Sequence, residues 1–202
     1  MKTILAAILG GLAVFGWGAV SWMALPWHIP TMNVFANEEQ VTQVLTDNAP
    51  VSGVYVMPNP QRAHSNTHPG EAEKAQEEAR ERMKQGPFVF VSYSREGMDP
   101  QMKREMPYAI ALNIVVAFLI VALLKATDSV GYFGRVLFVT AIGVVIALGG
   151  VAPNWIWWRF STDFTLVNCA DTVIGWFVAG LIIAALTGEE RSRLGATYRR
   201  RI

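Results

Sequence analysis

Residues 4–25 read ILAAILGGLAVFGWGAVSWMAL, an apolar run without a charged side chain. A helix needs about 20 mostly apolar residues to cross a bilayer core of about 30 Å, so this run is long enough to span a membrane. The alternative is a cleaved signal peptide, because Ala19 and Ser21 are small residues at the spacing that a signal peptidase requires. The run is longer than the apolar region of a usual signal peptide, and we predict that it is kept as an anchor.

Three further apolar stretches meet the same length requirement: residues 108–124, 136–151 and 165–186. Pro107 precedes the first of them, where the first turn of a helix tolerates proline. Pro153 follows the second and is expected to end that helix. The composition agrees, since 16% of the residues are charged, against about 25% in a typical soluble domain. The sequence predicts an integral membrane protein, mainly α-helical, with four transmembrane helices.

Basic residues are distributed unevenly over the short segments that flank these spans. The short connection between the last two spans carries only Arg159. Because basic residues accumulate on the cytoplasmic side of a membrane, both termini are predicted to be cytoplasmic. The domains expected are helix one (1–25), an extracytoplasmic α+β domain (26–107), helices two to four (108–188) and a basic cytoplasmic tail (189–202). The basic residues on the cytoplasmic side are Lys2, Lys125, Arg135, Arg191, Arg193, Arg199, Arg200 and Arg201.

The segment 26–107 contains signals for two helices and two strands. Asn37 is a good N-cap and begins a predicted helix that runs to about Leu45. Residues 71–85 mix acidic and basic side chains with almost no apolar face, so this predicted helix lies in water. The strands are expected at residues 50–57 and 88–93, and the chain between them is long enough for the crossover of a parallel pair.

The apolar core available to this α+β domain is small. A unit of this size is marginally stable alone. We therefore expect it to lean on the membrane face, on a second copy or on a partner protein. Its expected core residues are Val41, Val44, Leu45, Val54, Val56, Phe88 and Phe90.

Asp171 is the most informative polar residue, because a carboxylate inside a predicted span costs about 2.5 kcal/mol or more. Asn168 lies three residues earlier on the same helical face, and Asn113 is expected at a similar depth in helix two. These side chains form either a site for a proton, an ion or a polar head group, or hydrogen bonds that hold the helices together. We favour the second interpretation, with Asp171 either protonated or paired to Arg159, since the spans contain no second carboxylate and proton relays normally use a series.

Methionine and histidine concentrate in the predicted extracytoplasmic segment. Met98, Met102 and Met106 are four residues apart, so a helix would align them on one face. Together with His64 and His68 they form a soft ligand set suited to copper(I). The alternative is that the methionines are adaptable apolar fillers between the domain and the membrane.

Other function classes find little support. Cys169 is the single cysteine, which excludes an internal disulfide framework and a thiolate metal site. A net charge of +1 gives no argument for nucleic acid. The chain has no nucleophile motif, phosphate loop or zinc signature. These absences argue against an enzyme but leave enzymatic activity an open question.

Small residues in helix one, Ala7 and Gly11, are spaced for close helix packing. The leading hypothesis is an accessory or assembly protein of a bacterial-type inner (plasma) membrane, in contact with lipid and with another membrane protein or a second copy. A copper-handling membrane protein is the alternative. A third, weaker hypothesis is a membrane enzyme or carrier centred on Asp171.

Overall fold

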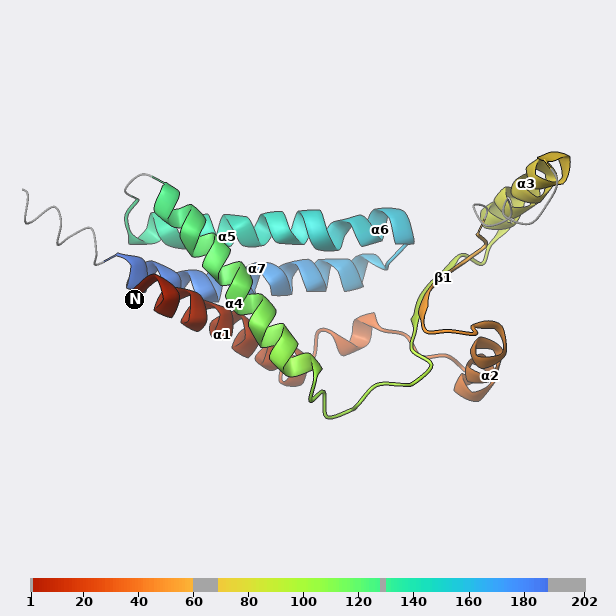
Figure 1. The fold of residues 1–202 in the computed structure, drawn as a ribbon, viewed down its shortest axis with the longest axis horizontal. Coiled ribbons are helices and arrows are strands. Elements are labelled where there is room, and N and C mark those ends of the chain that lie inside the picture. Colours follow the sequence, from red (N-terminus) through yellow and green to blue (C-terminus); the bar gives the residue numbers. More distant parts are fainter. Residues whose placement is uncertain (1, 60–68, 128–129, 189–202) are drawn as a thin grey trace, which may run out of the picture. The chain divides into compact units, whose positions relative to one another are not determined.

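The computed structural model describes residues 2–59, 69–127 and 130–188. In these ranges the protein is mainly helical, with four helices long and apolar enough to cross a membrane and a two-stranded sheet (Figure 1). The chain divides into two compact units. The bundle unit comprises Met1–Asn33 and Gln101–Ile202, and the insert unit comprises Val34–Pro100. Residues 26–33 and 101–107, which were expected in the α+β domain, therefore belong to the bundle unit.

The bundle unit contains all four predicted spans as helices. These are α1 (Lys2–Met23), α4 (Glu105–Ala126), a continuous helix Tyr132–Trp158, and α7 (Thr162–Thr187). The continuous helix consists of α5 (Tyr132–Ile146), a π-helical segment (Ala147–Val151) and α6 (Ala152–Trp158).

The expectation that Pro153 ends the third helix is wrong. The helix runs on to Trp158, and Arg159 then stops it in the left-handed conformation, with φ of 60°. Proline lacks the N–H that would close an α-helical turn, and its ring crowds the carbonyl four residues earlier. The π-helical segment Ala147–Val151 loosens the hydrogen-bond ladder just before the proline, and this lets the chain stay helical.

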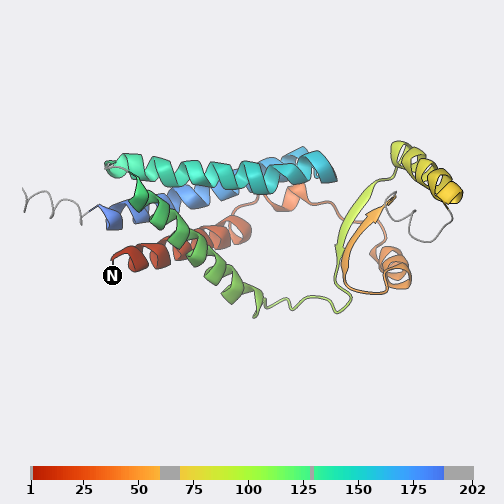
Figure 2. The same cartoon turned by 45° about the horizontal axis from the view of Figure 1, so that its top comes forward.

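Helix α1 packs against both α4 and α7, and α5 packs against α7. Figure 1 and Figure 2 show α4 crossing α1 obliquely. Gly11 makes this crossing close, since a Cβ at this position would lie 2.6 Å from the Ile114 Cα. Ala7 is buried as well, so both small residues singled out in α1, Ala7 and Gly11, are used within the chain. The core residues are Ala6, Ala117, Ile120, Val121, Leu124, Val139, Trp176, Ala179 and Ile183.

The insert unit contains the predicted helices and strands. They are α2 (Glu38–Asn48), β1 (Gly53–Met57), α3 (Pro69–Gln85) and β2 (Val89–Tyr93). The N-cap is confirmed, because the Asn37 Oδ1 accepts a hydrogen bond from the Gln40 N–H at 2.9 Å. Gly86 follows α3 with φ of 78°, a conformation that suits glycine at a helix end.

The two strands are antiparallel, so the long chain between them is not the crossover of a parallel pair. Gly53 lies opposite Tyr93, and Met57 lies opposite Val89. A parallel crossover needs a helix with an apolar face that packs on the sheet. Helix α3 has no such face, and it lies near the end of the ribbon where β1 finishes (Figure 2). The chain therefore returns at the end it left, as an enlarged hairpin.

Candidate functional site

Polar side chains gather where α1 ends and α7 begins. Ser21 of α1 and His28 of the following segment are 0% and 1% exposed. Asp171 of α7 lies beside them, with 16% of its side chain exposed. We call Trp17, Ser21, Trp27, His28 and Asp171 the His28 cluster.

Asp171 receives donors from the first helix of the chain. The Trp17 indole N–H donates to the Asp171 Oδ1 at 2.6 Å and to the Asp171 backbone oxygen at 3.1 Å. The Asp171 Oδ2 lies 3.6 Å from the His28 Nε2. Both carboxylate oxygens thus face donors or potential donors, which offsets the cost of burying this group. These contacts join α1 to α7.

His28 is enclosed by aromatic rings. The Trp22 indole stacks on its imidazole with ring centroids 3.8 Å apart and an interplanar angle of 10°. The Trp27 ring meets it edge-on at 5.7 Å. The Thr31 hydroxyl donates to the His28 backbone oxygen at 2.7 Å and closes the short 3-10 helix η1 (Ile29–Thr31). His28 therefore fixes the segment after α1 to the end of the bundle.

The two ring nitrogens of His28 differ in their surroundings. Nε2 lies 2.9 Å from the Ser21 Oγ, which also accepts the Trp27 indole N–H at 2.9 Å. Nδ1 is buried and has no hydrogen-bond partner among the described residues. A hydrogen on Nε2 suits the facing Asp171 carboxylate, and it leaves a lone pair on Nδ1.

The cluster is not a hydrolase triad. In a Ser-His-Asp triad the carboxylate holds one ring nitrogen while the other faces the serine. Here Asp171 and Ser21 both face the His28 Nε2. The Ser21 hydroxyl is also fully buried. This arrangement can hold the helices together by hydrogen bonds.

The expected polar group Asn113, Asn168 and Asp171 is not joined by hydrogen bonds in the described part of the chain. The Asn168 side chain donates to the Phe164 backbone oxygen of its own helix at 2.8 Å. Asn113 lies on α4, which packs against α1. Arg159 is exposed at the end of α6, while the side-chain partners of Asp171 among the described residues are Trp17 and His28.

The expected helical alignment of the three methionines is wrong. Helix α4 begins only at Glu105, and Met102 has a left-handed φ of 49°. Met98 belongs to the insert unit, whereas Met102 and Met106 belong to the bundle unit. Among the described residues, no group of three or more His, Cys, Asp or Glu side chains could hold a metal ion. The remaining candidate ligands, His64 and His68, lie outside the described residues.

Sequence reasoning missed Trp17 and His28 as site residues. Trp17 and Ser21 are four apart, so one helical face carries both, and this spacing was an available signal. For His28 no spacing rule applies, because it follows the end of the helix.

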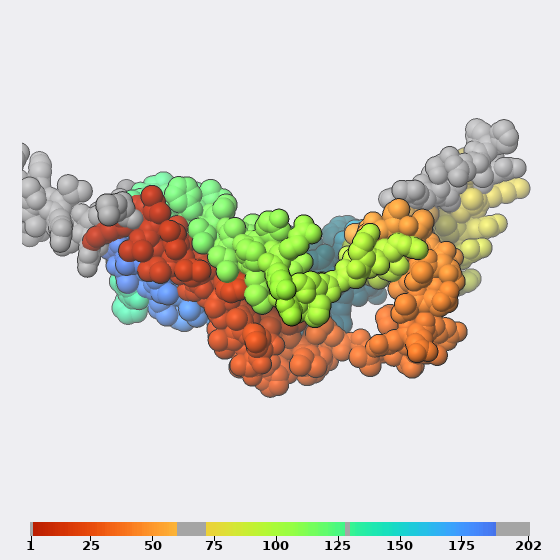
Figure 3. Space-filling view, turned by 60° about the horizontal axis from the view of Figure 1, so that its bottom comes forward, coloured from red at the N-terminus to blue at the C-terminus, as the bar shows by residue number. Residues whose placement is uncertain are grey.

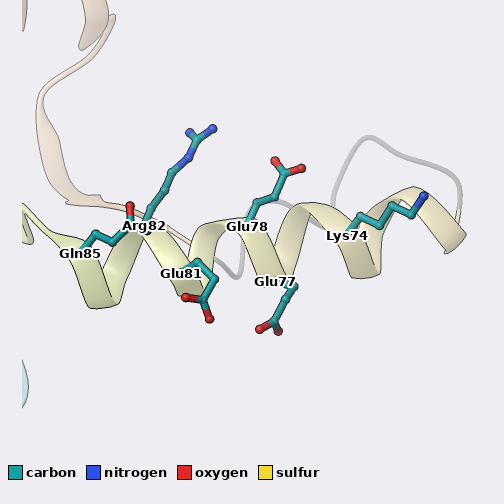
Figure 4. Close-up of a pocket in the computed structure, with 6 residues that line it drawn as sticks. All are labelled: Lys74, Glu77, Glu78, Glu81, Arg82 and Gln85. Atoms are coloured by element: carbon teal, nitrogen blue, oxygen red, sulfur yellow. The ribbon is translucent and has the colours of Figure 1, made fainter.

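Helix α3 carries no convergent site. Figure 4 shows a shallow hollow in which Glu78 and Arg82 project to one side of the helix and Glu77 and Glu81 to the other. Lys84 pairs with Glu81 at 2.5 Å, which raises the pKa of the Lys84 amine. Most described side chains of α3 are exposed, as expected for a solvated helix.

Comparisons of the chain with protein-family models, with curated proteins and with solved structures find no match.

Proposed function

We propose that this chain is a membrane accessory or assembly protein whose insert unit binds another membrane protein or a second copy. In this proposal the insert unit faces the extracytoplasmic side of a bacterial-type inner membrane, which the distribution of basic residues supports. The observation that carries the proposal is the uncovered apolar surface of the insert unit.

The insert unit buries few of its own apolar side chains. Among its described residues, the buried apolar residues are Ala49 and Ala72, which are 4% and 7% exposed. Val44 of α2 is 55% exposed and Val54 of β1 is 62% exposed, although both were expected in the core. Figure 3 shows the orange atoms of the α2 and β1 region at the surface. Covering apolar area contributes roughly 25 cal/mol per Å², so a partner that packs here stabilises the unit.

Among the described residues, no third strand pairs with either edge of the sheet of the insert unit. The ribbon has two strands, and neither Gly53–Met57 nor Val89–Tyr93 contains a charged residue or a proline. Natural proteins usually protect an open edge with such residues, because its unpaired N–H and C=O groups invite another strand. A ribbon of two strands is also marginally stable alone. An extended segment of a partner can pair with this edge. It would bond the unpaired N–H and C=O groups and add a third strand that stabilises the ribbon.

The insert unit is braced so that this surface is held in one shape. The Arg95 guanidinium donates to the backbone oxygens of Thr46 and Ala49 at 3.4 and 3.3 Å, and so caps the end of α2. The Ser52 Oγ accepts the Arg95 N–H at 2.9 Å and donates to a Glu96 carboxylate oxygen at 2.5 Å. These bonds tie α2 to the ribbon, so less conformational freedom is lost when a partner binds.

The bundle unit supports this function as a platform. Its outward side chains, such as Leu112, Val115 and Leu119 of α4, are exposed and apolar, which suits contact with lipid. Its Trp17, Ser21 and Asp171 side chains are engaged within the His28 cluster. The copper-handling alternative has no geometry in its favour among the described residues, since the methionines share no helical face.

Site-specific photo-crosslinking in native membranes tests the proposal. A crosslinking amino acid at position 54 is expected to capture one discrete partner, and the matched control at the exposed α3 position 81 is not. Two differently tagged copies of the chain distinguish a second copy from another protein. Val54→Glu is expected to abolish co-purification of that partner. Equal labelling from positions 54 and 81, with an unaffected Val54→Glu complex, would contradict the proposal.

A further inference from the structure

The geometry points to a proton-binding site at His28, with Asp171 as the counter-ion and the buried Nδ1 as the atom that takes up the proton. This site is independent of the docking function proposed above, since it uses only residues of the bundle unit.

The proton balance is simple. In the neutral form His28 carries its hydrogen on Nε2, between the Ser21 Oγ at 2.9 Å and the Asp171 Oδ2 at 3.6 Å. A proton from water adds to the Nδ1 lone pair, and no bond breaks. The product is an imidazolium beside a carboxylate. The attraction between these charges is stronger in a partly buried site than in water.

The described groups that face His28 are neutral or acidic. Helix α1 contributes the neutral Ser21 and the stacked Trp22 ring, and an indole face attracts a cation. The segment after α1 contributes the neutral Trp27 and Thr31. Helix α7 contributes Asp171, the one titratable or charged group in contact with His28 among the described residues.

Proton uptake strengthens the attachment of the segment after α1, which leads to the insert unit, to the helices of the bundle unit. His28 lies in the segment between α1 and that unit, and its ring is the link from this segment to α7. A charged His28 adds an ion pair to this link. The strength of this link therefore depends on whether Nδ1 carries a proton.

The first test leaves the cluster unchanged. The chain has three histidines, so the double substitution of His64→Gln and His68→Gln makes His28 the single imidazole. Nitrogen NMR of the purified, histidine-labelled protein in detergent micelles then follows its two ring nitrogens from pH 8 to pH 5. We expect one reversible change to the doubly protonated form. A single neutral tautomer at every pH, with the protein still folded, would overturn the proposal.

The second test addresses the counter-ion. In the same background, Asp171→Asn is expected to abolish the doubly protonated form over this range. Asp163→Asn is the matched control, because this carboxylate begins the same helix and has no contact with His28 among the described residues. An Asp171→Asn protein that titrates as the parent does would refute the assigned role of Asp171. Exchange of the amides at 24–33 is expected to slow on protonation, relative to intrinsic rates.

Discussion

Trp17 donates its indole N–H to the Asp171 carboxylate at 2.6 Å, across 154 positions of the sequence. An acidic residue inside an apolar helix usually marks a functional site or pairs with a cation. Here an uncharged donor on the neighbouring helix satisfies one oxygen, and His28 lies beside the other at 3.6 Å. The contact therefore holds α1 to α7 and also prepares Asp171 to balance a charge on His28.

Trp17→Phe is expected to lower the free energy of unfolding by about 1–3 kcal/mol, because it leaves a partly buried carboxylate oxygen without its donor. Unfolding in mixed detergent micelles measures this change. Trp157→Phe is the matched control, since Trp157 is exposed at the end of the third helix, and it should have little effect. Equal losses in both variants would contradict a special role for the Trp17 bond.

Asp171→Asn is expected to keep most of the stability that Asp171→Ala loses. An asparagine oxygen at this position can still accept the Trp17 N–H, and a neutral hydrogen bond contributes about 0.5–1.5 kcal/mol. Because the docking surface lies on the other unit, both variants should retain crosslinking from position 54. The two measurements are unfolding in micelles and crosslinking yield; loss of the crosslink in a folded Asp171→Asn protein would link the cluster to docking.

Gly11→Ala is expected to destabilise the bundle by about 1–3 kcal/mol, because the new methyl group meets backbone atoms of α4 that cannot move aside. Its Cβ would lie 2.6 Å from the Ile114 N and Cα atoms. Gly16→Ala is the internal control, since no atom lies within 4 Å of its Cβ position. Thermal unfolding of the two purified variants ranks them. If Gly16→Ala proved the more harmful, the α1–α4 packing described above would be incorrect.

Acid is expected to loosen the bracing of the insert unit through Glu96. The hydrogen bond from the Ser52 hydroxyl, and then the backbone, lower the pKa of Glu96 from its ordinary value of 4.5. The unfolded chain therefore binds this proton more readily, so the stabilisation is present above pH 4.5 and is lost as pH falls through the lower folded value.

Amide exchange of β2, corrected for intrinsic rates, checks the Glu96 prediction. The wild-type protein should be better protected than Glu96→Gln near neutral pH, and the difference should disappear in acid. Glu78→Gln on the exposed face of α3 is the control and should behave as wild type at every pH. If the two proteins still differ in protection below the pKa of Glu96 in the folded protein, Glu96 acts through its shape rather than its charge.

Local patterns were sufficient for much of the fold. Four helices predicted from length and apolarity are confirmed, at residues 4–25, 108–124, 136–151 and 165–186. They could be predicted because the ability to cross a bilayer depends on one continuous stretch of chain. The N-cap at Asn37 is equally local, since its bond reaches only three residues.

Signals that depend on the context of a residue were weaker. Pro153 breaks an isolated helix, but a π-helical segment of the same chain absorbs it. The spacing of Met98, Met102 and Met106 matches a helical face, yet helix α4 starts too late to use it. In both cases the backbone conformation of neighbouring residues overrode a rule based on single residues and spacing.

The sequence by itself determined which segments are apolar helices and which helix remains in water, since these properties follow from side chains close together in the chain. Only the tertiary structure decided that the strands pair antiparallel and that His28 lies buried between Trp22 and Asp171. Those outcomes depend on how α1 and α7 pack and on where α3 returns the chain. The physical reason is that hydrogen bonds and ring contacts act over a few ångströms in space, whatever the distance along the sequence.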